Sequence, residues 1–203
     1  LRRLLCNERL EKIRTSVPRR TWEFLHSVVI AEGPSQPRLK AGVAVAIVRD
    51  CLAALAALHR ARIVHSDIKP ANVMINFTGS AKIIDIGSAF QIDNPPPQRS
   101  CTPQYAAPEV LEGGECTPRS DLASLGYVLI ELLSGQPCFS SKLNLAELLE
   151  AKRSLSHRLD EILPDEVTVN ELLMHLCKGL VAADPNLRFP TAEAADLREE
   201  GAA

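Results

Sequence analysis

Residues suited to phosphoryl transfer gather in one short stretch, positions 65–75, which reads HSDIKPANVMI. It contains a carboxylate at Asp67, a cation at Lys69 and an amide oxygen at Asn72. A second carboxylate follows at Asp85. Phosphoryl transfer depends mainly on positioning the reactants and neutralising charge, and Mg²⁺ bridges the phosphate oxygens. These residue types in this order therefore predict a site that transfers a phosphoryl group.

Each of the four residues has a predicted role. Mg²⁺ takes oxygen ligands and keeps several waters, so one carboxylate and one amide carbonyl from the protein suffice, and we expect Asp85 and Asn72 to be those ligands. We expect Asp67 to accept the proton of an attacking hydroxyl, or to orient that hydroxyl. We expect Lys69 to offset the charge that builds on the transferred group.

A predicted β-hairpin brings the two halves of this site together. Residues 73–75 read as a short strand, residues 76–80 as a polar turn, and residues 81–84 as the returning strand. This hairpin would place Asp85 beside Asn72.

Two strongly apolar segments are predicted to be helices of the core. Residues 41–59 are apolar nearly all round, which is typical of a buried helix. Residues 121–134 are similarly apolar and end at Gly135, a helix stop signal. Arg49 and Asp50 interrupt the first segment, so it lacks the ~20 uninterrupted apolar residues that a membrane span requires.

Weaker patterns predict elements elsewhere. Residues 1–16 suggest one amphipathic helix. Residues 22–31 are apolar and β-branched enough for one or two strands. Three further helices are expected over residues 143–152, 167–183 and 191–199.

Length, charge and cysteine spacing limit the class of protein. The 203 residues fit one domain, or a domain plus a fragment, and the chain starts at Leu1 rather than methionine, so we expect it to be part of a longer product. The formal net charge of −2 offers no electrostatic reason to expect a nucleic acid or an anionic membrane as partner. The six cysteines are scattered without a CxxC pair, which favours reduced thiols and a cytoplasmic protein.

Four motifs along the chain resemble those of protein kinases. HSDIKPAN at residues 65–72 and DIG at residues 85–87 resemble the catalytic HRDxKxxN loop and the metal-binding DFG turn. TPQYAAPE at residues 102–109 resembles the end of an activation segment. DLASLG at residues 121–126 resembles the start of the central helix, and ADPNLR at residues 183–188 resembles the motif whose arginine pairs with the APE glutamate. By this resemblance the chain is identified as a eukaryotic-like serine/threonine protein kinase.

The resemblance implies an α+β, protein-kinase-like fold of two lobes. Residues 38–203 are expected to form the mostly helical C-terminal large lobe, and residues 1–37 an incomplete N-terminal small lobe. The Gly/Pro loop that starts at Glu32 resembles the hinge, where backbone groups meet the adenine of ATP. Glu8 or Glu11 is the candidate for the glutamate that pairs with the phosphate-holding lysine, and a solvated charged helix face is the alternative.

The resemblance also implies three supporting contacts. Thr102 is expected to bond the catalytic aspartate and lysine, which argues against tyrosine specificity. Asp121 is expected to be buried and to accept backbone NH groups of the catalytic loop, since an unpaired buried carboxylate is costly. Glu109 and Arg188 are expected to form a buried ion pair.

The chain departs from the family pattern at several points. Ser66 replaces the arginine that would clamp a phosphate on the activation loop. Ile86 replaces the phenylalanine of DFG, and we expect it to remain an apolar plug. The glycines never fall as GxGxxG, and no lysine lies in a strand-like setting ahead of the first apolar helix.

Three explanations stay open for the missing phosphate-gripping parts. The first strands of the small lobe could precede Leu1, or the chain could be a pseudokinase or truncated lobe that serves as a protein-binding module. The third alternative is a small-molecule kinase of the aminoglycoside or choline type, which lacks the APE segment. The expected reaction is transfer of the γ-phosphoryl of ATP, with Mg²⁺, to a Ser or Thr hydroxyl of a protein. Neither nucleic acid nor membrane is expected as a partner of this segment.

Overall fold

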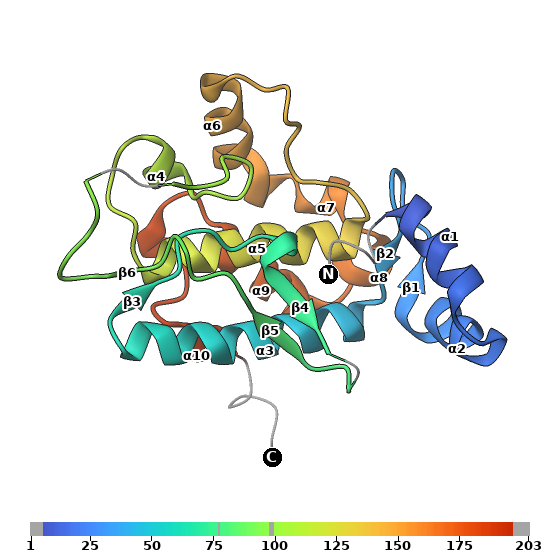
Figure 1. Ribbon diagram of the computed structural model, residues 1–203. Coiled ribbons are helices and arrows are strands. Elements are labelled where there is room, and N and C mark those ends of the chain that lie inside the picture. Colours follow the sequence, from blue (N-terminus) through green and yellow to red (C-terminus); the bar gives the residue numbers. More distant parts are fainter. Residues whose placement is uncertain (1–5, 77, 98–99, 197–203) are drawn as a thin grey trace, which may run out of the picture.

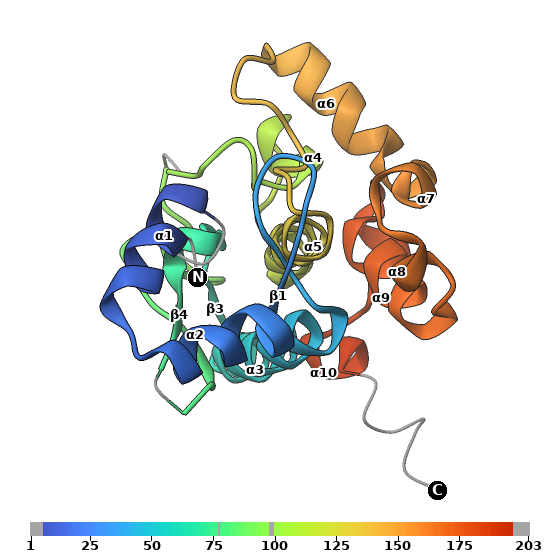
Figure 2. The ribbon, with the colours of Figure 1, turned by 90° about the vertical axis from the view of Figure 1, so that its right-hand side faces the viewer.

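The fold is built around one buried helix, α5 (Pro118–Ser134). In this computed structural model, which describes residues 6–76, 78–97 and 100–196, α5 crosses the middle of the molecule (Figure 1). Figure 2 shows it nearly end-on, with α3, α9 and α6 around it. Every residue from 120 to 134 is buried, as a helix that is apolar all round requires.

Local sequence signals define both ends of α5. Thr117 and Ser120 form a capping box at its start, and Pro118 occupies the first turn, where a missing N–H costs nothing. Gly135 ends the helix in the left-handed conformation, at φ 71°. The helix therefore starts three residues before the predicted position and ends where it was predicted to end.

The second core helix is α3 (Ala41–Arg60), which packs against α5. It is long and apolar enough, by length and composition alone, to cross a membrane. Its two charged interior residues are used within the fold: Arg49 pairs with Asp196 at 2.9 Å, and an Asp50 carboxylate oxygen accepts the Ala81 N–H at 2.8 Å. Its buried face belongs to the core of this domain.

Short antiparallel strand pairs lie beside α3. β4 (Val73–Ile75) pairs with β5 (Ala81–Ile83), so the predicted hairpin is confirmed, with a returning strand one residue shorter than predicted. β3 (Ile63–Val64) pairs with β6 (Phe90–Gln91). The two pairs position the start and the end of the polar loop that contains the predicted catalytic residues.

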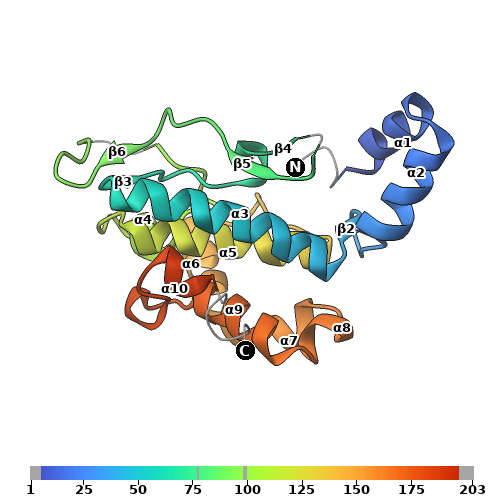
Figure 3. The same cartoon turned by 90° about the horizontal axis from the view of Figure 1, so that it is seen from below.

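The N-terminal part projects from the body beyond one end of α3 and α5 (Figure 3). It consists of α1 (Asn7–Ser16), α2 (Arg19–Phe24) and a π-helix η1 (Leu25–Val29), followed by β1 (Ile30–Ala31) and β2 (Arg38–Leu39). The predicted amphipathic helix is present over its described part.

The prediction of one or two strands over residues 22–31 is wrong for most of that range. Only Ile30 and Ala31 are in a strand, and their partner is the equally short β2. A strand needs a neighbouring strand for its backbone groups, whereas a helix satisfies them within itself. With two residues of partner strand available, residues 22–29 remain helical.

Shorter helices complete the body of the molecule on the side of α5 away from the hairpin. The prediction of one helix over residues 167–183 is wrong, because the Asn170 side chain accepts the Leu173 N–H at 3.0 Å and starts a new helix there. The helix predicted over residues 191–199 is shorter, and residues 197–199 lie outside the described part of the chain. The elements are α4 (Pro108–Leu111), α6 (Leu145–Ser154), η3 (Leu155–His157), α7 (Leu159–Ile162), α8 (Asp165–Thr168), α9 (Glu171–Val181), η4 (Pro185–Leu187) and α10 (Ala192–Ala195).

The contact of α5 with α9 depends on one glycine. A Cβ atom added at Gly126 would lie 2.6 Å from Val181 Cγ1 and 2.7 Å from Leu180 Cβ. Both atoms belong to packed core side chains, so they have little room to move. The absence of a side chain at this position lets the two helices approach closely.

We therefore expect Gly126→Ala to lower the free energy of unfolding by about 1–3 kcal/mol, the usual cost of overpacking a core. Gly42→Ala is the matched control, since a Cβ atom there meets no heavy atom within 4 Å in α3. The control should be neutral or should stabilise by up to about 1 kcal/mol through helix propensity. Urea denaturation measures both, and equal stability of the two variants would contradict the close contact.

Candidate active site

The predicted catalytic loop is anchored from below by a buried carboxylate of α5. Asp121 is 1% exposed, and its two oxygens accept the backbone N–H groups of His65 and Ser66, both at 2.8 Å. His59 Nε2 lies 2.9 Å from the same carboxylate. Ser66 has a φ of 63°, an uncommon left-handed conformation for a residue other than glycine. The contacts of Asp121 hold the loop in this conformation.

Asp67 lies at the centre of a network of hydrogen bonds. One carboxylate oxygen accepts from Lys69 Nζ at 2.5 Å, and the other accepts from the Thr102 hydroxyl at 2.8 Å. Lys69 Nζ also donates to the Thr102 hydroxyl at 2.9 Å. Asn72 Nδ2 donates to the backbone oxygen of Asp67 at 2.9 Å. The structure therefore brings together three residues predicted from the loop and one from the activation segment, 30 or more positions away.

The hairpin brings the second predicted carboxylate to the same site. The Ile84 N–H donates to the Asn72 carbonyl at 2.8 Å, so Asp85 follows directly after a residue bonded to Asn72. The Asn72 amide nitrogen is directed at Asp67, which leaves its amide oxygen for another partner. An amide oxygen just before β4 and a carboxylate just after β5 are ligands that fit Mg²⁺.

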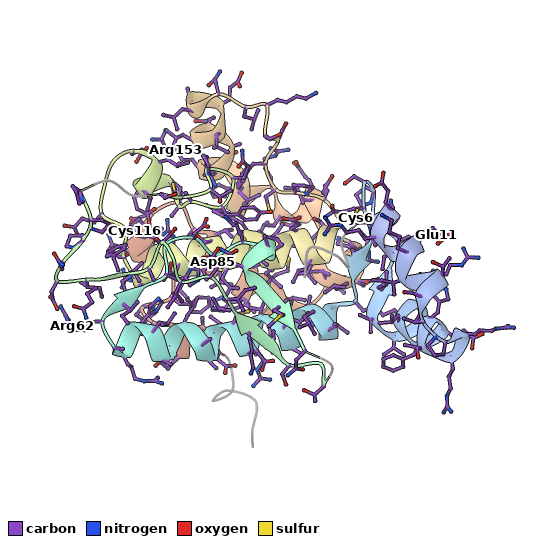
Figure 4. The ribbon with its side chains drawn as sticks, viewed as in Figure 1. Cys6, Glu11, Arg62, Asp85, Cys116 and Arg153 are labelled. Carbon is purple, nitrogen blue, oxygen red and sulfur yellow. The ribbon has the colours of Figure 1, made fainter. Side chains whose placement is uncertain are left out.

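The turn that contains Asp85 is open to solvent. Asp85, labelled in Figure 4, has a φ of 64° and is exposed. Ile86 is 67% exposed, so the expectation that it forms an apolar plug is wrong. Met74 and Ile84 on the same hairpin are exposed as well. The helices of the N-terminal part stand to one side (Figure 3), so within the described residues no apolar surface covers this face of the hairpin.

The APE glutamate and the distant arginine form a bidentate pair. Arg188 donates to the two Glu109 oxygens at 2.7 and 2.8 Å, and the Arg188 side chain is 0% exposed. Ser120 Oγ adds a further donor to Glu109 at 2.8 Å. Burial raises the pKa of the Glu109 carboxyl, but the hydrogen bond and charge of Arg188 outweigh that effect, so the pKa lies below its ordinary value. This pair joins the activation segment to the C-terminal end of the domain.

A cavity of about 660 Å³ opens beside the Asp67 network. Lys69 and Thr102 form one part of its wall, and Glu131 of α5 forms another. Tyr105 Oη donates to a Glu131 carboxylate oxygen at 2.5 Å. Glu131 was not among the predicted site residues, although a carboxylate within an otherwise apolar buried helix is a detectable signal of a polar contact.

Of the residues predicted for the small lobe, Glu32 and Glu11 lie away from the Asp67 network, whereas Glu8 lines the cavity beside it. The Glu32 carbonyl accepts from Arg38 Nε at 2.9 Å, and Glu32 lines a second cavity of about 540 Å³ that Lys69 and Thr102 do not border. Glu11 pairs with Arg14 at 2.9 Å on the exposed face of α1, and Figure 4 shows it well apart from Asp85. Glu8 borders the cavity beside Lys69. The contact of Glu11 matches the solvated helix face that was the alternative prediction.

We expect Glu109→Gln to lower the free energy of unfolding by about 3 kcal/mol at neutral pH, because Arg188 would stay buried without its charged partner. A carboxyl with a lowered pKa stabilises the fold above its unfolded pKa and loses that effect as pH falls through the folded value. The difference between parent and variant should therefore shrink below about pH 4.

Chemical denaturation at a series of pH values measures this effect. Glu161→Gln is the control, because the Glu161–Arg158 pair is exposed on both sides at 3.4 Å and should contribute less than about 1 kcal/mol. If Glu109→Gln lowered the free energy of unfolding no more than this control, the Glu109–Arg188 pair would not stabilise the segment that contains Glu109.

Comparison with known proteins places the chain in a family. A family model described as the protein kinase domain matches residues 23–197. Serine/threonine-protein kinase PknB of Mycobacterium tuberculosis (strain ATCC 25618 / H37Rv) is 38% identical over 122 residues, 57% of this chain and 19% of that protein. PknB of Mycolicibacterium smegmatis (strain ATCC 700084 / mc(2)155) is 33% identical over 186 residues, 87% of this chain and 28% of that protein.

The chain is also similar to a mammalian serine/threonine-protein kinase. Serine/threonine-protein kinase PAK 1 of Mus musculus is 34% identical over 118 residues, 57% of this chain and 22% of that protein. The chain spans less than a third of the length of these three curated relatives. Its kinase-like architecture, mostly helical with few strands, agrees with the match to the family model. The chain belongs to the protein kinase domain family.

Proposed function

We propose that this domain transfers the γ-phosphoryl of ATP to a serine or threonine hydroxyl of a protein substrate. The observation that carries the proposal is the hydrogen-bonded set of Asp67, Lys69 and Thr102 at the wall of the larger cavity. The relatives named as serine/threonine-protein kinases support the choice of acceptor. A cytoplasmic location is part of the same proposal.

The reaction assigns a task to each side chain. Asp67 orients the acceptor hydroxyl and takes its proton as the new P–O bond forms, while the bond to the leaving ADP oxygen breaks. Lys69 offsets the negative charge on the transferred group, and Thr102 keeps the Asp67 carboxylate in place. Asn72 and Asp85 would hold Mg²⁺, which neutralises the phosphate oxygens when it is bound.

A binding module without catalysis is the second candidate. Two observations favour it: the Asp85 turn is open to solvent, and Glu11 is paired with Arg14 rather than with a lysine that could hold phosphate. In that case the same surface would bind a partner protein without turnover. The retained set of Asp67, Lys69, Asn72 and Asp85 speaks against this reading, because protein binding alone does not require these groups.

Mg²⁺-dependent transfer of labelled phosphate from ATP to a generic protein substrate tests the proposal. We expect Asp67→Asn to reduce transfer by about 100-fold or more, because the proton acceptor is lost. Asp85→Asn should abolish the Mg²⁺-dependent transfer. Asp93→Asn is the control, since Asp93 is exposed and pairs with Arg62 away from the site.

Each outcome separates the candidates. Unchanged turnover in Asp67→Asn would exclude the proposed mechanism. Transfer only to an aminoglycoside or to choline would favour the small-molecule kinase. No transfer by the parent, with ATP binding still measurable by calorimetry, would favour the binding module.

A further inference from the structure

A lysine is buried beneath the segment that carries Thr102. Lys152 of α6 is 0% exposed, although lysine is almost never fully buried without a charged partner. Its Nζ lies 4.1 Å from the ring centroids of both Tyr127 and Phe139. The two rings meet edge to face at 5.1 Å and enclose the amine on two sides.

The amine makes one hydrogen bond, and that bond reaches the activation segment. Lys152 Nζ donates to the backbone carbonyl of Gln104 at 2.9 Å. Within the described part of the chain, no carboxylate forms an ion pair with it; the twelve ion pairs found there all involve other cations. The side chain therefore supports one backbone carbonyl and has no counter-ion.

Gln104 lies between two residues of the proposed site. Thr102, two positions before it, holds Asp67 and Lys69. Tyr105, directly after it, bonds Glu131 on the wall of the larger cavity. The Lys152 contact is therefore a second support of residues 102–105 from the core side, beside the bond of Tyr105 to Glu131.

Burial disfavours the charged form of the amine, whereas the ring faces of Tyr127 and Phe139 favour it. Burial lowers the pKa of Lys152 to about 7, the largest effect on this group. The titratable and charged groups that face it do not supply a free negative charge, because burial raises the pKa of each thiol and the one carboxylate is already bonded to the one arginine. These groups are Tyr127, Cys101, Cys138, Glu109 and Arg188.

We propose that Lys152 is a positioning residue for residues 102–105, that it holds them as a neutral amine, and that uptake of a proton by the amine releases them. The neutral amine still donates to the Gln104 carbonyl and can direct an N–H at a ring face. The consequence for phosphoryl transfer rests on the proposed function, whereas the contact itself does not.

The direction of the pH effect follows from the two protonation states. When residues 102–105 move away and water reaches the amine, its pKa returns toward the ordinary value of about 10.4. Opening of residues 102–105 therefore takes up a proton. The opening equilibrium becomes more favourable as pH falls from about 10.4 to about 7. Between pH 8 and pH 6 the opening equilibrium should shift about tenfold toward the open form.

Amide hydrogen exchange measures this equilibrium without any need for catalysis. The N–H groups of Tyr105 and Ala106 both donate to the Thr102 carbonyl at 2.9 Å, so their protection reports whether the segment is closed. Lys152→Met keeps a similar side-chain length and removes the proton-binding group. Lys142→Met is the matched control, because Lys142 is exposed ahead of α6.

In the parent and in Lys142→Met, we expect protection of these two amides to fall about tenfold from pH 8 to pH 6, after correction for intrinsic exchange. In Lys152→Met the change should be less than about twofold. A tenfold fall that persisted in Lys152→Met would overturn the proposal. An NMR titration of the Lys152 Cε resonance tests the parent protein without any variant. A resonance that titrates only near the ordinary lysine value would also overturn the proposal.

A kinetic measurement tests whether the contact of Lys152 with the Gln104 carbonyl affects phosphoryl transfer. If the parent transfers phosphate, kcat/KM for a peptide should fall as pH decreases from about 8 to about 7 and level off below that, and Lys152→Met should lack that inflection. An inflection that persisted in the variant would overturn the role of Lys152 in positioning. Absence of transfer by the parent would refute the proposed function alone, because hydrogen exchange would still decide the role of Lys152.

Discussion

The structure depends above all on how one buried carboxylate is satisfied. Asp121 lies inside an apolar helix, where an unpaired charge would cost several kcal/mol. It is stabilised by the N–H groups of His65 and Ser66 and by His59. Because these partners come from the loop and from α3, one carboxylate fixes the loop against both core helices. The conformation of the Asp67 loop is therefore coupled to the integrity of the core.

Other side chains along helix α5 also contact distant parts of the chain. At its start Ser120 donates to Glu109, in its middle Tyr127 packs against Lys152, and near its end Glu131 bonds Tyr105. The helix is buried all round, so polar groups such as those of Ser120 and Glu131 bond to other elements, whereas the buried Tyr127 hydroxyl has no hydrogen-bond partner among the described residues. Two of these partners, Glu109 and Tyr105, belong to the segment that follows Thr102. The core helix thus determines where that segment lies relative to the Asp67 carboxylate.

Much of the site was predictable because its signals are local. The order of residue types in 65–75, the hairpin and the two apolar helices are encoded by spacing, periodicity and stop signals such as Gly135. The buried state of Lys152 was not predictable, because α6 carries several charges and nothing in its spacing marks one of them as internal. The openness of Ile86 was equally hidden, since exposure depends on what packs above a residue.

The sequence by itself determined the family, the likeness of the loop to a phosphoryl-transfer site, and the positions of the core helices. Tertiary structure decided which distant groups meet, such as Thr102 with Lys69, and whether residues 22–29 form strand or helix. The physical reason is that capping and hydrophobic periodicity act within a few residues, whereas pairing and burial depend on surfaces brought together by the whole chain. Residues 22–29 have β-forming composition but only a two-residue strand nearby, so the helix prevails.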